Sequence, residues 1–168
     1  MTTKPIFYVM GVSGCGKSTI GKLLSKNLAM PFFDGDDYHP EANVKKMEAG
    51  NPLNDFDRQG WLERLNQLAI EHGQSGAIIA CSALKDAYRT MLTKDLPESY
   101  FVYLAGTYDE ISARLAQRKD HFMPAALLQS QFNTLEVPKN AISVSIANTP
   151  EEIVTAIVSQ YKLKSLDL

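Results

Sequence analysis

The sequence has few cysteines, no long apolar run and no excess of charge of either sign. Cys15 and Cys81 are the only cysteines, and neither lies in a metal-ligand spacing, so we expect no disulfide. The N-terminal residues lack the apolar core of a signal peptide, and no stretch is long enough to cross a membrane. A formal net charge of -2 gives no sign of a nucleic acid-binding surface. These absences predict a cytoplasmic protein that binds neither membranes nor nucleic acids.

Apolar runs and helical patterns alternate along the chain, whose 168 residues are expected to form one domain spanning residues 1–168. Strands are expected at 5–10, 30–33, 77–81, 100–104 and 142–146. Helices are expected at 19–28, 40–49, 55–71, 85–93, 108–118, 124–135 and 150–161. Because strands alternate with helices, the pattern predicts a three-layer α/β fold in which helices cover both faces of a five-stranded parallel sheet.

Residues 11–18 read Gly-Val-Ser-Gly-Cys-Gly-Lys-Ser and fit the phosphate-binding loop pattern G-x-x-x-x-G-K-[ST] at every fixed position. Glycines let backbone N–H groups approach phosphate oxygens, and the following helix adds partial positive charge. Lys17 is expected to reach the β- and γ-phosphates, and the Ser18 hydroxyl to ligate Mg²⁺. The motif therefore predicts a nucleotide site whose contacts are Gly11, Val12, Ser13, Gly14, Cys15, Gly16, Lys17, Ser18 and Thr19.

Other motifs distinguish among the classes of protein that share this loop. A GTPase needs a guanine-reading [N/T]-K-x-D, which is absent, and the D-x-x-G match at 57–60 does not follow a strand. A motor ATPase usually has an acid at the end of an apolar strand, where this chain has Cys81. Asp34 and Asp36 instead follow the second strand and resemble the D-x-D of the P-loop kinases related to shikimate kinase. That resemblance implies that Asp34 organises Mg²⁺ and that Asp36 binds the acceptor hydroxyl and helps to remove its proton.

Several segments together resemble the gluconokinase family over nearly the whole chain. They are residues 11–18, 34–40, 52–58 with Trp61 and Leu62, 81–89, 118–123 and 131–136. Two departures are small, because Cys15 in place of the commoner Ser and Asp120 in place of the commoner Gly remove no phosphate-facing backbone group. The resemblance implies a homodimeric kinase that phosphorylates D-gluconate at its 6-hydroxyl with ATP and Mg²⁺, giving 6-phospho-D-gluconate and ADP.

Gluconate carries one carboxylate and several hydroxyls, so its site needs cations as well as hydrogen-bonding groups. The candidate cations are Arg58, Lys85 and Arg89, and the candidate hydroxyl partners are Asp36 and His39. Lys85 and Arg89 are four residues apart and are expected to share one helical face, converging on one ligand. Some of these residues also have a purely structural alternative. Arg58 could pair with Asp55, and Arg89 could pair with a carboxylate elsewhere. His39 could be an ordinary residue at the start of a helix.

A lid is expected at about 114–124, where Arg114 and Arg118 are four residues apart near the end of a helix. In related kinases such arginines fold over ATP, and closure excludes the water that would compete as acceptor. The catalytic residues are therefore predicted to be Lys17, Asp36 and Arg118. The alternative is that both arginines are solvated at a helix C-terminus, where cations are favourable.

Two rival functions remain open at this point. A kinase for another small acid, such as shikimate, or for a nucleoside monophosphate would need much of the same site. A nucleotide-sensing module without catalysis is disfavoured, because a pure binder has no need of the acceptor-side acid Asp36 beside an intact Lys17 and Ser18.

Overall fold

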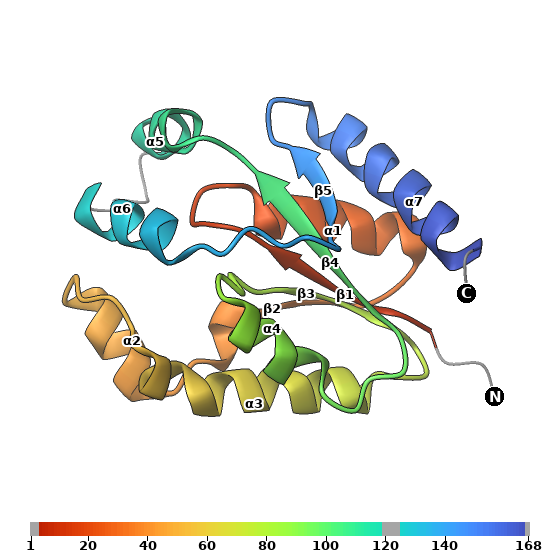
Figure 1. Cartoon of the computed structure of the whole chain (residues 1–168), viewed down its shortest axis with the longest axis horizontal. Helices are drawn as coiled ribbons and strands as arrows, with labels where there is room; N and C mark the ends of the chain where they lie inside the picture. Colours follow the sequence, from red (N-terminus) through yellow and green to blue (C-terminus); the bar gives the residue numbers. More distant parts are fainter. Residues whose placement is uncertain (1–3, 119–124, 167–168) are drawn as a thin grey trace.

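A computed structural model describes residues 4–118 and 125–166 of the chain. Its centre is a five-stranded sheet in the order β2-β3-β1-β4-β5, with every neighbouring pair parallel (Figure 1). The strands are β1 (Ile6–Met10), β2 (Phe32–Asp34), β3 (Ala77–Ala80), β4 (Ser99–Ala105) and β5 (Ile142–Ser145). The helices are α1 (Lys17–Leu28), α2 (Glu41–Glu48), α3 (Asp55–Glu71), α4 (Asp86–Thr93), α5 (Tyr108–Ala116), α6 (Ala125–Thr134) and α7 (Pro150–Leu166). The predicted five-stranded parallel α/β fold is confirmed.

Strand β1 lies at the middle of the sheet, and all five of its residues are buried. Phe7 and Val9 pack into one core together with apolar residues of α1, α5, α6 and α7. Ile6, Tyr8 and Met10 pack into the other core with residues of α3 and α4. Figure 1 shows α1 and α7 on one side of the sheet and α3 with α4 on the other. The strand is apolar at every position because both of its faces are covered.

Element boundaries differ from the predicted ones at a few ends. Strand β2 starts at Phe32, because Met30 still takes part in the termination of α1. The Met30 N–H donates to the carbonyl of Ser25 in that helix. Helix α5 ends at Ala116, and the next two N–H groups, those of Gln117 and Arg118, bond three residues back. Helix α7 continues to Leu166, five residues beyond the expected end. Among the described residues, no helix combines the length and the apolar character that a membrane span requires.

The carboxyl ends of the parallel strands bring the predicted site segments to one edge of the sheet. Residues 11–18 follow β1, the 3-10 helix η1 (Gly35–Tyr38) follows β2, and residues 81–85 follow β3. The Gly11 N–H donates to the Ser82 carbonyl at 3.3 Å, which joins the first and third of these segments directly. Ligands of open α/β sheets bind at this edge, so the candidate active site is built here.

Candidate active site

The phosphate-binding loop ends at Gly16, which caps α1 in a left-handed conformation (φ 99°) and supplies no side-chain cap. The N–H groups of the first turn are thus left for an anion. The Lys17 ammonium lies back over the loop and donates to the carbonyls of Gly11 at 3.0 Å and Val12 at 3.1 Å. Gly11 has φ 146°, and a Cβ there would lie 2.7 Å from Cys15 Sγ, so only glycine fits.

The two predicted metal ligands, Ser18 and Asp34, lie side by side. The Ser18 hydroxyl donates to Asp34 Oδ2 at 3.2 Å, and Asp34 Oδ1 accepts from the Asp36 N–H at 3.0 Å. One hydroxyl and one carboxylate are hard oxygen donors of the kind that Mg²⁺ prefers. Within the described ranges no cluster of three acidic, histidine or cysteine side chains could hold a metal. This donor set nevertheless fits Mg²⁺, which is usually held by one or two protein oxygens together with substrate phosphates.

Asp36 lies in η1, where its carboxylate is 79% exposed at the edge of the site. The preceding Gly35 lies so close to β3 that an added Cβ would be 2.3 Å from the Ala80 carbonyl oxygen. The absence of a side chain at residue 35 thus lets η1 pack directly against the sheet. The His39 ring lies 3.9 Å from Asp36 Oδ1, measured from Nε2, and stacks on Trp61. Burial and, secondarily, the charge of Arg58 lower the pKa of His39 to about 4, so the ring is neutral at pH 7.

The cations Arg58 and Lys85 meet around Tyr88. Arg58 donates to the Tyr88 hydroxyl at 3.1 Å, and that hydroxyl in turn donates to Asp55. Lys85 Nζ also binds the Asp55 carboxylate, at 3.1 Å. Hydrogen bonds from Tyr88 and Lys85 lower the pKa of Asp55, and the bond to Asp55 raises that of Lys85. Lys85 and the Tyr88 hydroxyl thus bind the Asp55 carboxylate directly, and Arg58 is linked to it through Tyr88; the ion-pair partner of Asp55 is Lys85 rather than Arg58.

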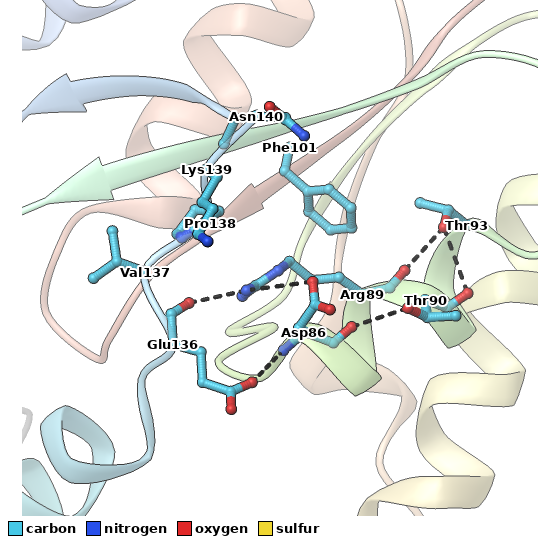
Figure 2. Close-up of a pocket in the computed structure, with 11 residues that line it drawn as sticks. Asp86, Arg89, Thr90, Thr93, Phe101, Glu136, Val137, Pro138, Lys139 and Asn140 are labelled. Carbon is cyan, nitrogen blue, oxygen red and sulfur yellow. Dashed lines mark hydrogen bonds and ion pairs between the residues drawn. The ribbon is translucent and has the colours of Figure 1, made fainter.

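Arg89 has a different environment from the one expected. Its side chain is 7% exposed, and its guanidinium donates to the carbonyls of Ala83 at 2.7 Å and Glu136 at 2.9 Å. Figure 2 shows it pointing toward Glu136. Both residues line a cavity of about 580 Å³ between α4 and residues 136–141. The lining of this cavity includes neither Lys17 nor Asp36. Burial lowers the pKa of Arg89.

The expected convergence of Lys85 and Arg89 on one ligand is therefore wrong in this structure. Lys85 precedes α4 in an extended conformation (φ -108°, ψ 149°), so the four-residue helical spacing does not apply to the pair. The Lys85 ammonium reaches Asp55 in α3, whereas the Arg89 guanidinium reaches the backbone on the other side of α4. Only Lys85 joins Arg58 at the acceptor side.

Arg114 and Arg118 lie beside the phosphate loop. Both line a cavity of about 370 Å³ that also includes Gly14, Gly16 and Thr19. The Arg114 guanidinium donates to the carbonyl of Ile146, the residue that follows β5. Residues 119–124 of the predicted lid lie outside the described residues.

Gln131 and Glu136 are two residues for which the sequence assigned no role. The Gln131 amide accepts from the Ser13 N–H at 2.7 Å and donates to the Ser13 hydroxyl at 3.0 Å. The Glu136 carboxylate accepts from the Asp86 N–H at 2.7 Å, at the start of α4 (Figure 2). Their presence in the family-like segment 131–136 was the only sequence signal, because their partners are 118 and 50 positions away.

Comparison with known proteins gives concordant matches. The Shikimate kinase family model matches residues 13–162. The chain is 42% identical to a probable gluconokinase of Mus musculus, over 96% of this chain and 100% of the mouse protein. It is 43% identical to the thermosensitive gluconokinase of Escherichia coli (strain K12), over 91% of this chain and 87% of that protein. The crystal structure of a gluconokinase from Sinorhizobium meliloti 1021 superposes with a TM-score of 0.88 at 37% identity, covering 95% of this chain and 93% of that one.

Proposed function

The chain belongs to the gluconokinase family, and on this premise we propose that it transfers the γ-phosphoryl group of ATP to the 6-hydroxyl of D-gluconate. The products are 6-phospho-D-gluconate and ADP. The observation that carries the proposal is the identity of about two residues in five to named gluconokinases across almost the whole chain. The arrangement of a phosphate loop, a D-x-D pair and a cationic group at one sheet edge supports it.

On the donor side, Lys17 and the N–H groups of the loop stabilise charge on the phosphoryl group as it is transferred. Lys17 now bonds to loop carbonyls, so its ammonium exchanges these partners for phosphate oxygens when ATP binds. Ser18 and Asp34 are the residues that would hold Mg²⁺, whose charge neutralises the β- and γ-phosphate oxygens. Asp34 also holds the Asp36 N–H, which couples the metal ligands to the acceptor side.

On the acceptor side, Asp36 orients the 6-hydroxyl and accepts its proton as the new bond to phosphorus forms. Arg58 and Lys85 supply the positive charge for the gluconate carboxylate, a role supported by the Asp55 carboxylate, which Lys85 and Tyr88 bind and to which Arg58 is linked through Tyr88. His39 adds a neutral hydrogen-bonding group next to Asp36. Arg89 supports this side indirectly, because it anchors the residues before α4 to residue 136.

The nucleotide cavity and its two arginines support the remaining assignments. Arg118 and Arg114 contact ATP from the lining of this cavity, with Arg118 closing over the phosphates as part of a lid at about 114–124. The chain functions as one kinase domain and as a homodimer, and light scattering on the purified protein tests the dimer directly.

A coupled assay of ADP release tests the proposed activity. The panel contains D-gluconate, other sugar acids, shikimate and nucleoside monophosphates, each with ATP and Mg²⁺. Turnover with gluconate is expected to exceed that with every other acceptor, and no gluconate-dependent turnover would sink the proposal. Lys17→Ala should lower turnover with every acceptor by at least about 100-fold. Lys22→Ala, which removes an exposed lysine of the same helix, should leave turnover unchanged.

A further inference from the structure

Asn43 is a polar side chain buried beside the acceptor side of the site, with 4% of the residue exposed. It lies in α2, and its amino nitrogen Nδ2 meets two groups from different parts of the chain. The first is the Asp57 carbonyl oxygen at 2.8 Å, and the second is His39 Nδ1 at 3.3 Å. Both hydrogens of one amide group are therefore in use.

The Asp57 carbonyl determines which way the Asn43 amide faces. A carbonyl oxygen can only accept, so the atom beside it must be the amino nitrogen of Asn43 and not its oxygen. The second hydrogen of that amino group then points to His39 Nδ1. Because an amide amino group can only donate, Nδ1 must carry a lone pair, and the single ring proton must be on Nε2.

The orientation of the His39 ring is set by its neighbours. The ring stacks on Trp61 with centroids 4.0 Å apart and planes 17° from parallel. The Trp61 indole N–H donates to the Gly35 carbonyl at 2.7 Å, which holds that platform against η1. The His39 side chain is 4% exposed, and its Nε2 faces Asp36 at 3.9 Å from Oδ1. That separation exceeds a direct hydrogen bond, so one oxygen of a bound acceptor can contact both groups.

The neutral form of the ring is consistent with this arrangement. Burial and Arg58 lower the pKa of His39 to about 4. Protonation would add a hydrogen at Nδ1, directly against the amino hydrogens of Asn43. The ring is thus held both in one orientation and in one protonation state.

We propose that Asn43 is a positioning residue that fixes His39 as the Nε2–H tautomer, whose N–H donates to a hydroxyl oxygen of the acceptor bound beside Asp36. This inference rests on the proposed kinase function and deepens it. The Asp36 carboxylate accepts a hydrogen bond and His39 donates one, and a hydroxyl group satisfies both. An ammonium group only donates and a carbonyl group only accepts, so the pair selects an acceptor that presents a hydroxyl group.

The test reads the tautomer directly, by ¹⁵N–¹H NMR of the histidine rings in the full-length protein at pH 8, with the His39 signal assigned from His39→Gln. The wild-type protein should show the Nε2–H pattern for His39. Asn43→Asp replaces the donor with a carboxylate that only accepts, so the Nε2–H pattern should be lost. Asn66→Asp is the matched control, because the Asn66 amide also donates to two carbonyls, at 2.9 Å each, but from the far part of α3.

Kinetics complete the test. Asn43→Asp and Asn43→Ala should lower kcat with gluconate by roughly 10- to 100-fold while leaving the KM for ATP unchanged, and Asn66→Asp should change neither. An Nδ1–H pattern in the wild-type spectrum would overturn the inference even if no Asn43 variant folds. If the wild-type protein gives the expected spectrum but does not phosphorylate gluconate, the proposed function is overturned and the tautomer assignment stands.

Discussion

Ser13 and Gln131 lie 118 positions apart and share two hydrogen bonds, one from the Ser13 N–H to the Gln131 amide oxygen and one from the Gln131 amide to the Ser13 hydroxyl. Ser13 lies in the middle of the phosphate loop, and Gln131 lies in α6, which follows the segment assigned to the lid. Helix α6 thus contacts the phosphate loop through Gln131. The segment that follows α6 contacts the start of α4 through Glu136.

Gln131→Ala should therefore loosen the phosphate loop without removing any phosphate contact. We expect kcat to fall about 10-fold, because displacing a reacting group by less than 1 Å already costs that much. Steady-state kinetics in both substrates provide the measurement. Gln129→Ala is the control, since Gln129 is exposed in the same helix and its side-chain amide donates to Asn133. A kcat equal to that of the control would show that the loop holds its shape alone.

Asp36→Asn should remove the proton acceptor on the acceptor side while keeping its shape. The expected result is a loss of roughly 10²- to 10⁴-fold in kcat, with nucleotide affinity unchanged, because the proposed nucleotide contacts (residues 11–19, Arg114 and Arg118) do not include Asp36. ATP affinity is measured by calorimetry and kcat by ADP release. Asp37→Asn changes the exposed neighbouring acid and should retain activity. Comparable activity in the two variants would refute the role given to Asp36.

Arg89→Ala should affect stability and gluconate binding together. The change removes the guanidinium from the buried carbonyl of Ala83 and the partly buried carbonyl of Glu136, and should lower the free energy of unfolding by about 1–3 kcal/mol. The KM for gluconate should rise more than that for ATP, because α4 carries Tyr88 and follows Lys85. Arg64→Ala, at an exposed arginine whose ion pair spans 4.0 Å, should stay within about 0.5 kcal/mol of wild type. Equal changes in both KM values would contradict the indirect role.

His39 should make the fold less stable in mild acid. Its pKa is about 4 in the folded protein and near 6.5 in the unfolded chain, so between these values only the unfolded chain takes up the proton. The free energy of unfolding should therefore fall by on the order of 1 kcal/mol per pH unit as pH drops from 6.5 toward 4. Urea unfolding at pH 7 and pH 5 measures the effect.

His39→Gln provides the comparison for that pH dependence. The variant should lose most of the additional slope below pH 6.5 and keep the wild-type behaviour between pH 7 and pH 8.5, where the ring is neutral in both states. An unchanged slope below pH 6.5 in this variant would assign the acid sensitivity to other groups.

Local patterns accounted for most of the fold. The apolar strand at 6–10, the glycine-rich loop and the helix after it follow from short-range backbone chemistry, and the structure has them where they were expected. The D-x-D pair was found in the same way, because a parallel strand must end at the ligand edge of the sheet. The positions of the phosphate loop and of Asp36 at this edge of the sheet were thus predictable from neighbouring residues.

The predicted convergence of Lys85 and Arg89 failed because a helical spacing rule was applied to a residue that lies outside the helix. Lys85 and Arg89 are four residues apart, but the helix begins at Asp86, so the side chains diverge. Arg89 then satisfies the carbonyl of Glu136, a residue 47 positions away that no local pattern connects to it.

The sequence by itself determined where the phosphate-loop motif and the D-x-D pair lie, since each depends on residues that are adjacent in the chain. Tertiary structure alone decided how those groups are held. The pairing of Gln131 with Ser13, the cations around Asp55, and the alignment of Asn43, His39 and Trp61 join distant segments. The physical reason is that a hydrogen bond depends on the direction and distance between two groups, and for distant segments only the packing of the whole sheet and its helices sets both.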